Sequence, residues 1–162
     1  WVENSAEFSF HNYYGFGVVD AAAAVASAET FAAGTFGEQA TSEVQTAANH
    51  TLIEGQEWAT TINNPTTGVA EYVRVILNLD APGETNRSVG VRLESPSGTL
   101  STVLQPWSWA NENLSADESI YLASSAFYGE AIAGDWKLHF YDHGVDGDQL
   151  HIETVTLKFF YR

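Results

Sequence analysis

The feature that most constrains this fold is a period-two alternation of apolar and polar residues in several separate runs. In residues 71–79, EYVRVILNL, every second residue from Val73 onward is Val or Leu. The same alternation occurs in residues 89–94, 136–141 and 154–161. Because successive side chains of a strand point to opposite faces of a sheet, each run predicts a strand with one face in a core.

Turn-forming residues separate these runs. They stand at Asn63-Asn64-Pro65, Asp80-Ala81-Pro82-Gly83, Ser95-Pro96-Ser97-Gly98 and Asp146-Gly147. Such residues end strands and set up tight connections. No internal repeat is evident, which argues against a propeller or a solenoid. The pattern therefore predicts an all-β chain, an antiparallel sandwich of about eight strands.

One segment near the start of the chain has a different character. Residues 18–31 are rich in alanine and predict a helix with a small apolar face. Gly34 and Gly37 follow and are expected to stop it. We therefore place a boundary between the helix and the strands near residues 33–42.

Composition excludes several functions. The 162 residues include 21 acidic and 6 basic ones, a formal net charge of −15. This charge disfavours nucleic acid as a partner and is compatible either with bound divalent cations or with a salt-rich habitat. There is no cysteine, which excludes disulfides, thiolate zinc sites and a cysteine nucleophile. No apolar run approaches the roughly 20 residues that a membrane-spanning helix needs.

Two separated tracts resemble the same type of protease. Residues 1–25 resemble the C-terminal end of a subtilisin-like, kexin-type catalytic domain, on the sequence Tyr14-Gly15-Phe16-Gly17-Val18-Val19-Asp20-Ala21. Residues 91–104 and 134–161 resemble the P domain (Homo B domain) that follows such catalytic domains. The matching elements are Ser95-Pro96-Ser97-Gly98-Thr99, Gly134-Asp135-Trp136, Tyr141-Asp142 and Gly147-Asp148-Gln149-Leu150.

This resemblance implies a domain plan and a function. Residues 1–33 would be the end of a catalytic domain, residues 34–41 a linker and residues 42–162 a jelly-roll P domain. The parent would be a secreted bacterial serine endopeptidase. Its P domain would pack on the catalytic domain in cis and stabilise it. The alternative is a module that binds a protein substrate such as collagen, or a glycan. The catalytic triad motifs of this family lie upstream, so we expect no peptidase activity from this chain alone.

A cluster of acidic residues is the main candidate for a metal site. Asp146, Gly147 and Asp148 form a tight turn, and Asp142 precedes it by four residues. Carboxylate oxygens are ligands that Ca²⁺ prefers. An EF-hand is excluded because both flanks alternate like strands. The resemblance implies a structural Ca²⁺ in this loop. The alternative is that these acids only form the turn and face solvent.

A second acidic loop is a weaker metal candidate. Asp80 and Glu84 lie in the sequence LDAPGETN, and either could supply a ligand. Related domains often carry an aspartate just before the next strand, but this chain has Ser88 at that position. The substitution weakens the case for a ligand there.

Two tryptophans could form a binding surface. Trp107 and Trp109 follow Pro106 in an expected loop, either as an exposed platform for a peptide or glycan or packed against the core or the protease domain. Packing is the interpretation we favour. Trp58 and Trp136 lie in strand-like runs and are expected in the core. The histidines are expected to be ordinary polar or half-buried residues.

Overall fold

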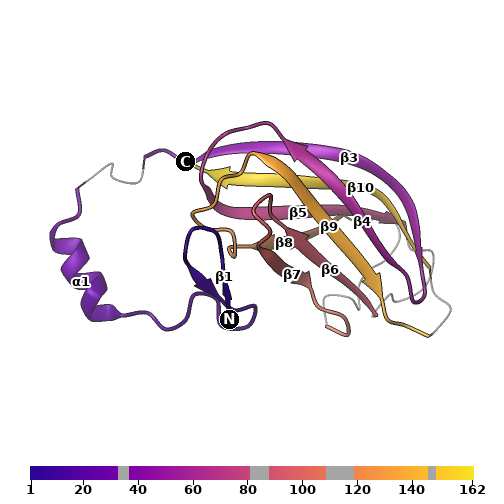
Figure 1. The fold of residues 1–162 in the computed structure, drawn as a ribbon, viewed down its shortest axis with the longest axis horizontal. Helices are drawn as coiled ribbons and strands as arrows, with labels where there is room; N and C mark the ends of the chain where they lie inside the picture. Colours follow the sequence, from indigo (N-terminus) through magenta and orange to yellow (C-terminus); the bar gives the residue numbers. More distant parts are fainter. Residues whose placement is uncertain (33–36, 81–87, 109–118, 146–148) are drawn as a thin grey trace.

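The computed structural model describes residues 1–32, 37–80, 88–108, 119–145 and 149–162. Strands dominate this part of the chain (Figure 1). In chain order the elements are β1 (Val2–Glu3), β2 (Ser9–Phe10), α1 (Ala21–Glu29), β3 (Ala40–Ile53), β4 (Glu57–Asn64), β5 (Ala70–Asp80), β6 (Val89–Glu94), β7 (Leu100–Leu104), β8 (Ser119–Ser124), β9 (Gly134–Asp142) and β10 (Gln149–Tyr161).

Strands β3 to β10 form two four-stranded sheets that face each other. Their strand orders are β3-β10-β5-β8 and β4-β9-β6-β7, with every neighbouring pair antiparallel. The predicted all-β antiparallel sandwich with one preceding helix is confirmed. The first strand of the sandwich pairs with its last, and the second pairs with the next to last. This order is compatible with the predicted jelly roll.

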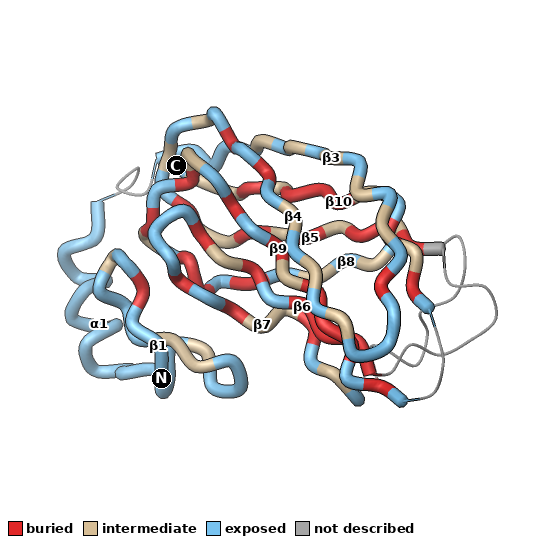
Figure 2. The backbone as a smooth tube through the Cα atoms, turned by 45° about the vertical axis from the view of Figure 1, so that its right-hand side comes forward, coloured by how far each residue is buried: buried red, intermediate tan, exposed pale blue. Residues whose placement is uncertain are grey.

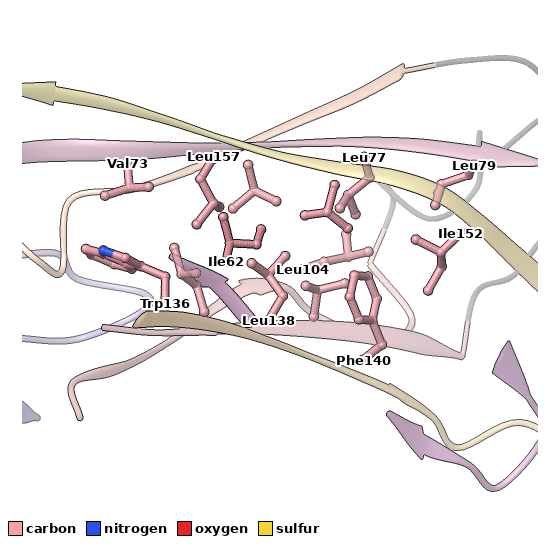
Figure 3. Packing of buried hydrophobic residues seen from close by; sticks show 14 of the residues in the cluster. Ile62, Val73, Leu77, Leu79, Leu104, Trp136, Leu138, Phe140, Ile152 and Leu157 are labelled. Carbon is pink, nitrogen blue, oxygen red and sulfur yellow. The ribbon is translucent and has the colours of Figure 1, made fainter. Parts of the chain in front are cut away.

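The alternating runs place their apolar residues between the sheets. In one sheet Val75 of β5 pairs with Leu157 of β10, and in the other Leu93 of β6 pairs with Leu138 of β9. Figure 3 shows Leu157 and Leu138 pointing toward each other from the two sheets. All four are fully buried, and burial of one such side chain contributes about 1.5–3 kcal/mol. The predicted inward faces are therefore confirmed.

Trp136 anchors one end of this core. Its ring is fully buried, and its indole N–H donates to the carbonyl oxygen of Ile132 at 2.8 Å. The Phe127 ring meets it edge to face with centroids 5.0 Å apart. A buried indole needs such an acceptor because an unpaired polar group in the core is costly. The expectation that Trp136 lies in the core is confirmed.

The helix is shorter than predicted and stands apart from the sandwich. It begins at Ala21, not near residue 18, because the Asp20 side chain accepts from the Ala23 amide at 2.9 Å and caps it. Every residue of α1 is exposed, and Figures 1 and 2 show it away from both sheets. Strand β3 then begins at Ala40, inside the segment expected to be a linker. Within the described ranges, no helix is long and apolar enough to cross a membrane.

Candidate functional site

The N-terminal hairpin (residues 1–17) is held on the sandwich by the side chain of Asn4. Strands β1 and β2 pair within this hairpin. The Asn4 carboxamide Nδ2 donates to the carbonyl oxygens of Ala126 and Tyr128, each at 2.9 Å. Its Oδ1 accepts from the amides of Ala6 at 3.1 Å and Phe8 at 2.9 Å. Both donors and both acceptor positions of this buried carboxamide are filled.

A buried carboxylate reinforces the same contact. Glu130 is 1% exposed and accepts from the Ser5 amide at 2.9 Å and from the Ser97 hydroxyl at 3.0 Å. The Thr99 hydroxyl donates to it as well. These three donors stabilise the charge where water does not reach it. Glu130 therefore ties the hairpin to the Ser-Pro-Ser-Gly-Thr turn of residues 95–99.

The backbones approach closely beside this carboxylate. Gly129 has φ +85°, and a Cβ there would lie 2.8 Å from the Cβ of Ala6 and 3.0 Å from the Phe8 ring. Only glycine suits both the conformation and the space. The Phe8 ring packs edge to face on Tyr128 with centroids 5.2 Å apart. Close packing at Gly129 and Tyr128, together with the hydrogen bonds, thus holds the hairpin on the turn of residues 125–130 between β8 and β9.

Much of the hairpin's apolar surface remains uncovered. Tyr13 is 77% exposed, Tyr14 71% and Trp1 66%. Exposed aromatic surface of this kind marks a site where another body packs. The hairpin is therefore attached to the sandwich and still exposes aromatic side chains.

The candidate calcium loop lies between β9 and β10, at one end of the sandwich. Asp142 ends β9 and is 1% exposed; its Oδ1 accepts from the Gly144 amide at 2.8 Å. Its Oδ2 and the hydroxyl of Ser88 are both buried, and neither has a hydrogen-bond partner among the described residues. The two residues are neighbours, since the His143 amide donates to the Ser88 carbonyl at 3.4 Å. A buried, unpartnered oxygen on each of two neighbouring residues is compatible with a bound cation.

The other predicted metal ligands cannot be placed. Asp146, Asp148 and Glu84 lie outside the described residues, as does the side chain of Asp80 at the end of β5. Within the described residues, no group of three or more His, Cys, Asp and Glu could hold a metal ion. The strands on both sides of the loop agree with the exclusion of an EF-hand. The calcium site stays a prediction.

Of the two tryptophans predicted to form a binding surface, the structure describes only Trp107. Trp107 follows β7 and is 65% exposed, with φ +62°; Trp109 lies outside the described residues. Whether Trp107 binds a ligand or packs on another domain stays a prediction. Trp58 is half-buried against the core and stacks on His50 with centroids 4.3 Å apart.

A polar cleft on the outer face of the β4-β9-β6-β7 sheet was not predicted. Glu94 lies between His139 Nε2 at 2.8 Å and Lys137 Nζ at 3.1 Å. The hydrogen bond from His139, and then that from Lys137, lowers the pKa of Glu94. Arg92 lies over the Tyr141 ring, 4.7 Å from its centroid. The alternation placed these residues outward, but no local pattern showed that they would converge.

The fold and the docked hairpin define an antiparallel β-sandwich domain that carries a preceding segment on its surface. The family model described as "Proprotein convertase P-domain" matches residues 70–159. This chain belongs to the proprotein convertase P-domain family, a non-catalytic part of subtilisin-like proteases.

Relatives place this domain within longer proteins. Endoprotease aex-5 of Caenorhabditis elegans is 32% identical over 139 residues, which are 85% of this chain and 23% of that protein. A serine protease of Aeromonas sobria matches all of this chain with 33% of its own at 19% identity, with a TM-score of 0.83 alone and 0.84 in complex with the chaperone ORF2. These matches to solved structures establish the fold. The chain spans a third or less of each of these proteins.

Proposed function

We propose that this P domain packs in cis on the catalytic domain of a secreted subtilisin-like serine endopeptidase and stabilises it. Residues 1–33 are then the end of that catalytic domain, 34–41 the connection and 42–162 the P domain. The observation that carries the proposal is the attachment of the N-terminal hairpin through Asn4 and Glu130. The exposed aromatic residues of the hairpin supply the surface for the rest of the catalytic domain.

A structural Ca²⁺ is part of this proposal. Asp142 Oδ2 and the Ser88 hydroxyl are buried without partners at the loop where the resemblance implies the ion. A cation that binds only the folded state raises stability by mass action. The catalytic work belongs to the upstream domain, and this domain contributes the folded platform on which that domain rests.

Removing residues 42–162 from the parent protease tests the docking function. We expect loss of folding, or a lower melting temperature together with lower activity on a small peptide. The matched variants Asn4→Ala and Glu130→Ala in the full protease should lower the melting temperature in the same direction. If the truncated protease keeps its stability and its peptide activity and loses only its activity on bulky protein, docking is not the function. The alternative, a substrate-binding module, would then hold.

A further inference from the structure

A cleft of about 330 Å³ opens on the outer face of the β4-β9-β6-β7 sheet. Three outward residues form one row across it, because Ala59 of β4 and Arg92 of β6 both pair with His139 of β9. The small side chain of Ala59 leaves the hollow, and Glu57 and Glu94 lie among the lining residues. Its volume falls within the roughly 300–1,000 Å³ of small-molecule sites.

Arg92 presents free donors to this cleft. Its guanidinium carbon lies 4.7 Å from the centroid of the Tyr141 ring, a cation–π contact that holds the side chain in place. Among the described residues, no carboxylate lies within ion-pair distance of Arg92. The guanidinium has several N–H groups in a planar fork, which suits two adjacent oxygen acceptors.

Glu94 and Glu57 supply the acceptors. The carboxylate of Glu94 is fixed by His139 at 2.8 Å and Lys137 at 3.1 Å, and each carboxylate oxygen has further acceptor capacity. Glu57 is exposed at the rim. Leu100, 40% exposed, adds an apolar wall.

The charges around the cleft select against ions. Arg92 offsets Glu57, and Lys137, which does not line the cleft, offsets Glu94 through their ion pair at 3.1 Å, so these charges sum to zero in a chain with a net charge of −15. An anion would meet the carboxylates of Glu57 and Glu94, and a cation would meet the guanidinium of Arg92. A neutral ligand that both donates and accepts hydrogen bonds, and that has a C–H surface, matches every part of this lining. A sugar has these properties.

We propose that this cleft binds a neutral sugar unit of an oligosaccharide. Arg92 donates to two adjacent hydroxyl oxygens, Glu57 and Glu94 accept from hydroxyl groups, and Leu100 packs against the C–H face of the ring. This function goes beyond docking on the catalytic domain. No residue of the N-terminal hairpin lines the cleft, so either function can fail without the other.

NMR titration of the ¹⁵N-labelled 162-residue chain tests the proposal. The probes are cellohexaose, maltohexaose and xylohexaose, with a heparin hexasaccharide as the anionic comparison. We expect at least one neutral probe to shift the backbone amides of Ala59, Gly90, Arg92 and His139 with a Kd of about 1 mM or tighter. The heparin fragment should bind more weakly.

Two variants separate binding from folding. Arg92→Ala removes the donors and should weaken binding at least about tenfold, or about 1.4 kcal/mol. Ala59→Phe fills the hollow and should abolish binding with the circular dichroism spectrum unchanged. Lys158→Ala, on the opposite sheet, should leave the affinity unchanged. The proposal is overturned if no neutral probe shifts these amides at about 10 mM, if both cleft variants bind normally, or if only heparin binds.

Discussion

Asn4 and Ala126 are joined by a hydrogen bond of 2.9 Å from the carboxamide Nδ2 to the main-chain carbonyl, although 122 residues separate them. The same carboxamide organises the turn of its own hairpin through the amides of Ala6 and Phe8. One side chain thus shapes the hairpin and attaches it to the sandwich. Asn4 therefore contributes both to the shape of the hairpin and to its attachment, beside the contact between Ser5 and Glu130.

Replacing Asn4 by alanine should release the hairpin. The buried carbonyl of Ala126 loses its donor, which costs about 1–3 kcal/mol, and the loss of the Tyr128 contact adds to this. Hydrogen exchange at the amides of β1 and β2, measured by mass spectrometry, should become at least about tenfold faster. Asn12→Ala, at an exposed position of the same hairpin, should leave exchange unchanged. Equal protection in both variants would show that Asn4 does not hold the hairpin.

The strands were predictable because their signal is local. Val75 and Leu157 lie in runs whose period of two is visible in the sequence, and burial follows directly from that period. The helix was predictable in kind, but its start was not. Val18 and Val19 continue the apolar pattern, yet the Asp20 side chain caps the helix after them.

The docking contact and the cleft were not predictable, because they depend on tertiary contacts. Nothing in the sequence near Asn4 or Glu130 indicates that the N-terminal hairpin contacts the turn of residues 125–130. Arg92 and His139 become neighbours only through the β6–β9 register. The resemblance to a known family predicted the class of the domain and a bound calcium ion. It did not predict these contacts, because they depend on how distant strands and turns pair in this chain.

Glu130 should prove important for the stability of the turn that it holds. Glu130→Ala leaves the Ser5 amide and the Thr99 hydroxyl without an acceptor. Because a hydrogen bond to a charged group is worth about 1.5–3 kcal/mol, we expect a loss of about 3 kcal/mol. Glu130→Gln should lose less, because its carbonyl oxygen can still accept from the Ser5 amide and the Thr99 hydroxyl, while the Ser97 hydroxyl can turn to accept from its amide. Urea unfolding should show both as a lower midpoint at unchanged m. Exposed Glu54→Ala is the control, and equal midpoints for it and Glu130→Ala would contradict this role.

Calcium should stabilise the chain through Asp142. At a Ca²⁺ concentration of about 100 times its Kd, the gain in the free energy of unfolding is about 2.7 kcal/mol. Differential scanning calorimetry should therefore show a higher Tm with Ca²⁺ than with EDTA. Asp142→Asn keeps the oxygen that accepts from Gly144 but loses the charge, and it should respond little. Glu153→Gln, at an exposed position of β10, should respond like the parent chain. A Tm that EDTA leaves unchanged would exclude a structural ion.

Gly90 should not tolerate a side chain. A Cβ there would lie 2.2 Å from Cζ and 2.4 Å from the hydroxyl oxygen of the Tyr141 ring. That ring is itself buried beneath Arg92, so Gly90→Ala must displace both and should cost about 1–3 kcal/mol. In a Tyr141→Ala background the same substitution should cost much less. Urea unfolding of the four chains in this double-mutant cycle measures the coupling. Equal costs in both backgrounds would locate the clash elsewhere.

Glu94 should make the stability depend on pH in the acid range. His139 first, and Lys137 second, lower the pKa of its carboxyl in the folded chain. A lowered folded pKa gives stability that is fully present above the unfolded value of about 4.3 and is lost as the pH falls through the folded value. The free-energy difference between the parent chain and Glu94→Gln, at most about 1 kcal/mol for so exposed a pair, should therefore shrink between neutral pH and about pH 3. In urea unfolding at each pH, His139→Gln should remove more of this pH dependence than Lys137→Ala. A difference that stays constant over this range would show that neither partner stabilises the carboxylate.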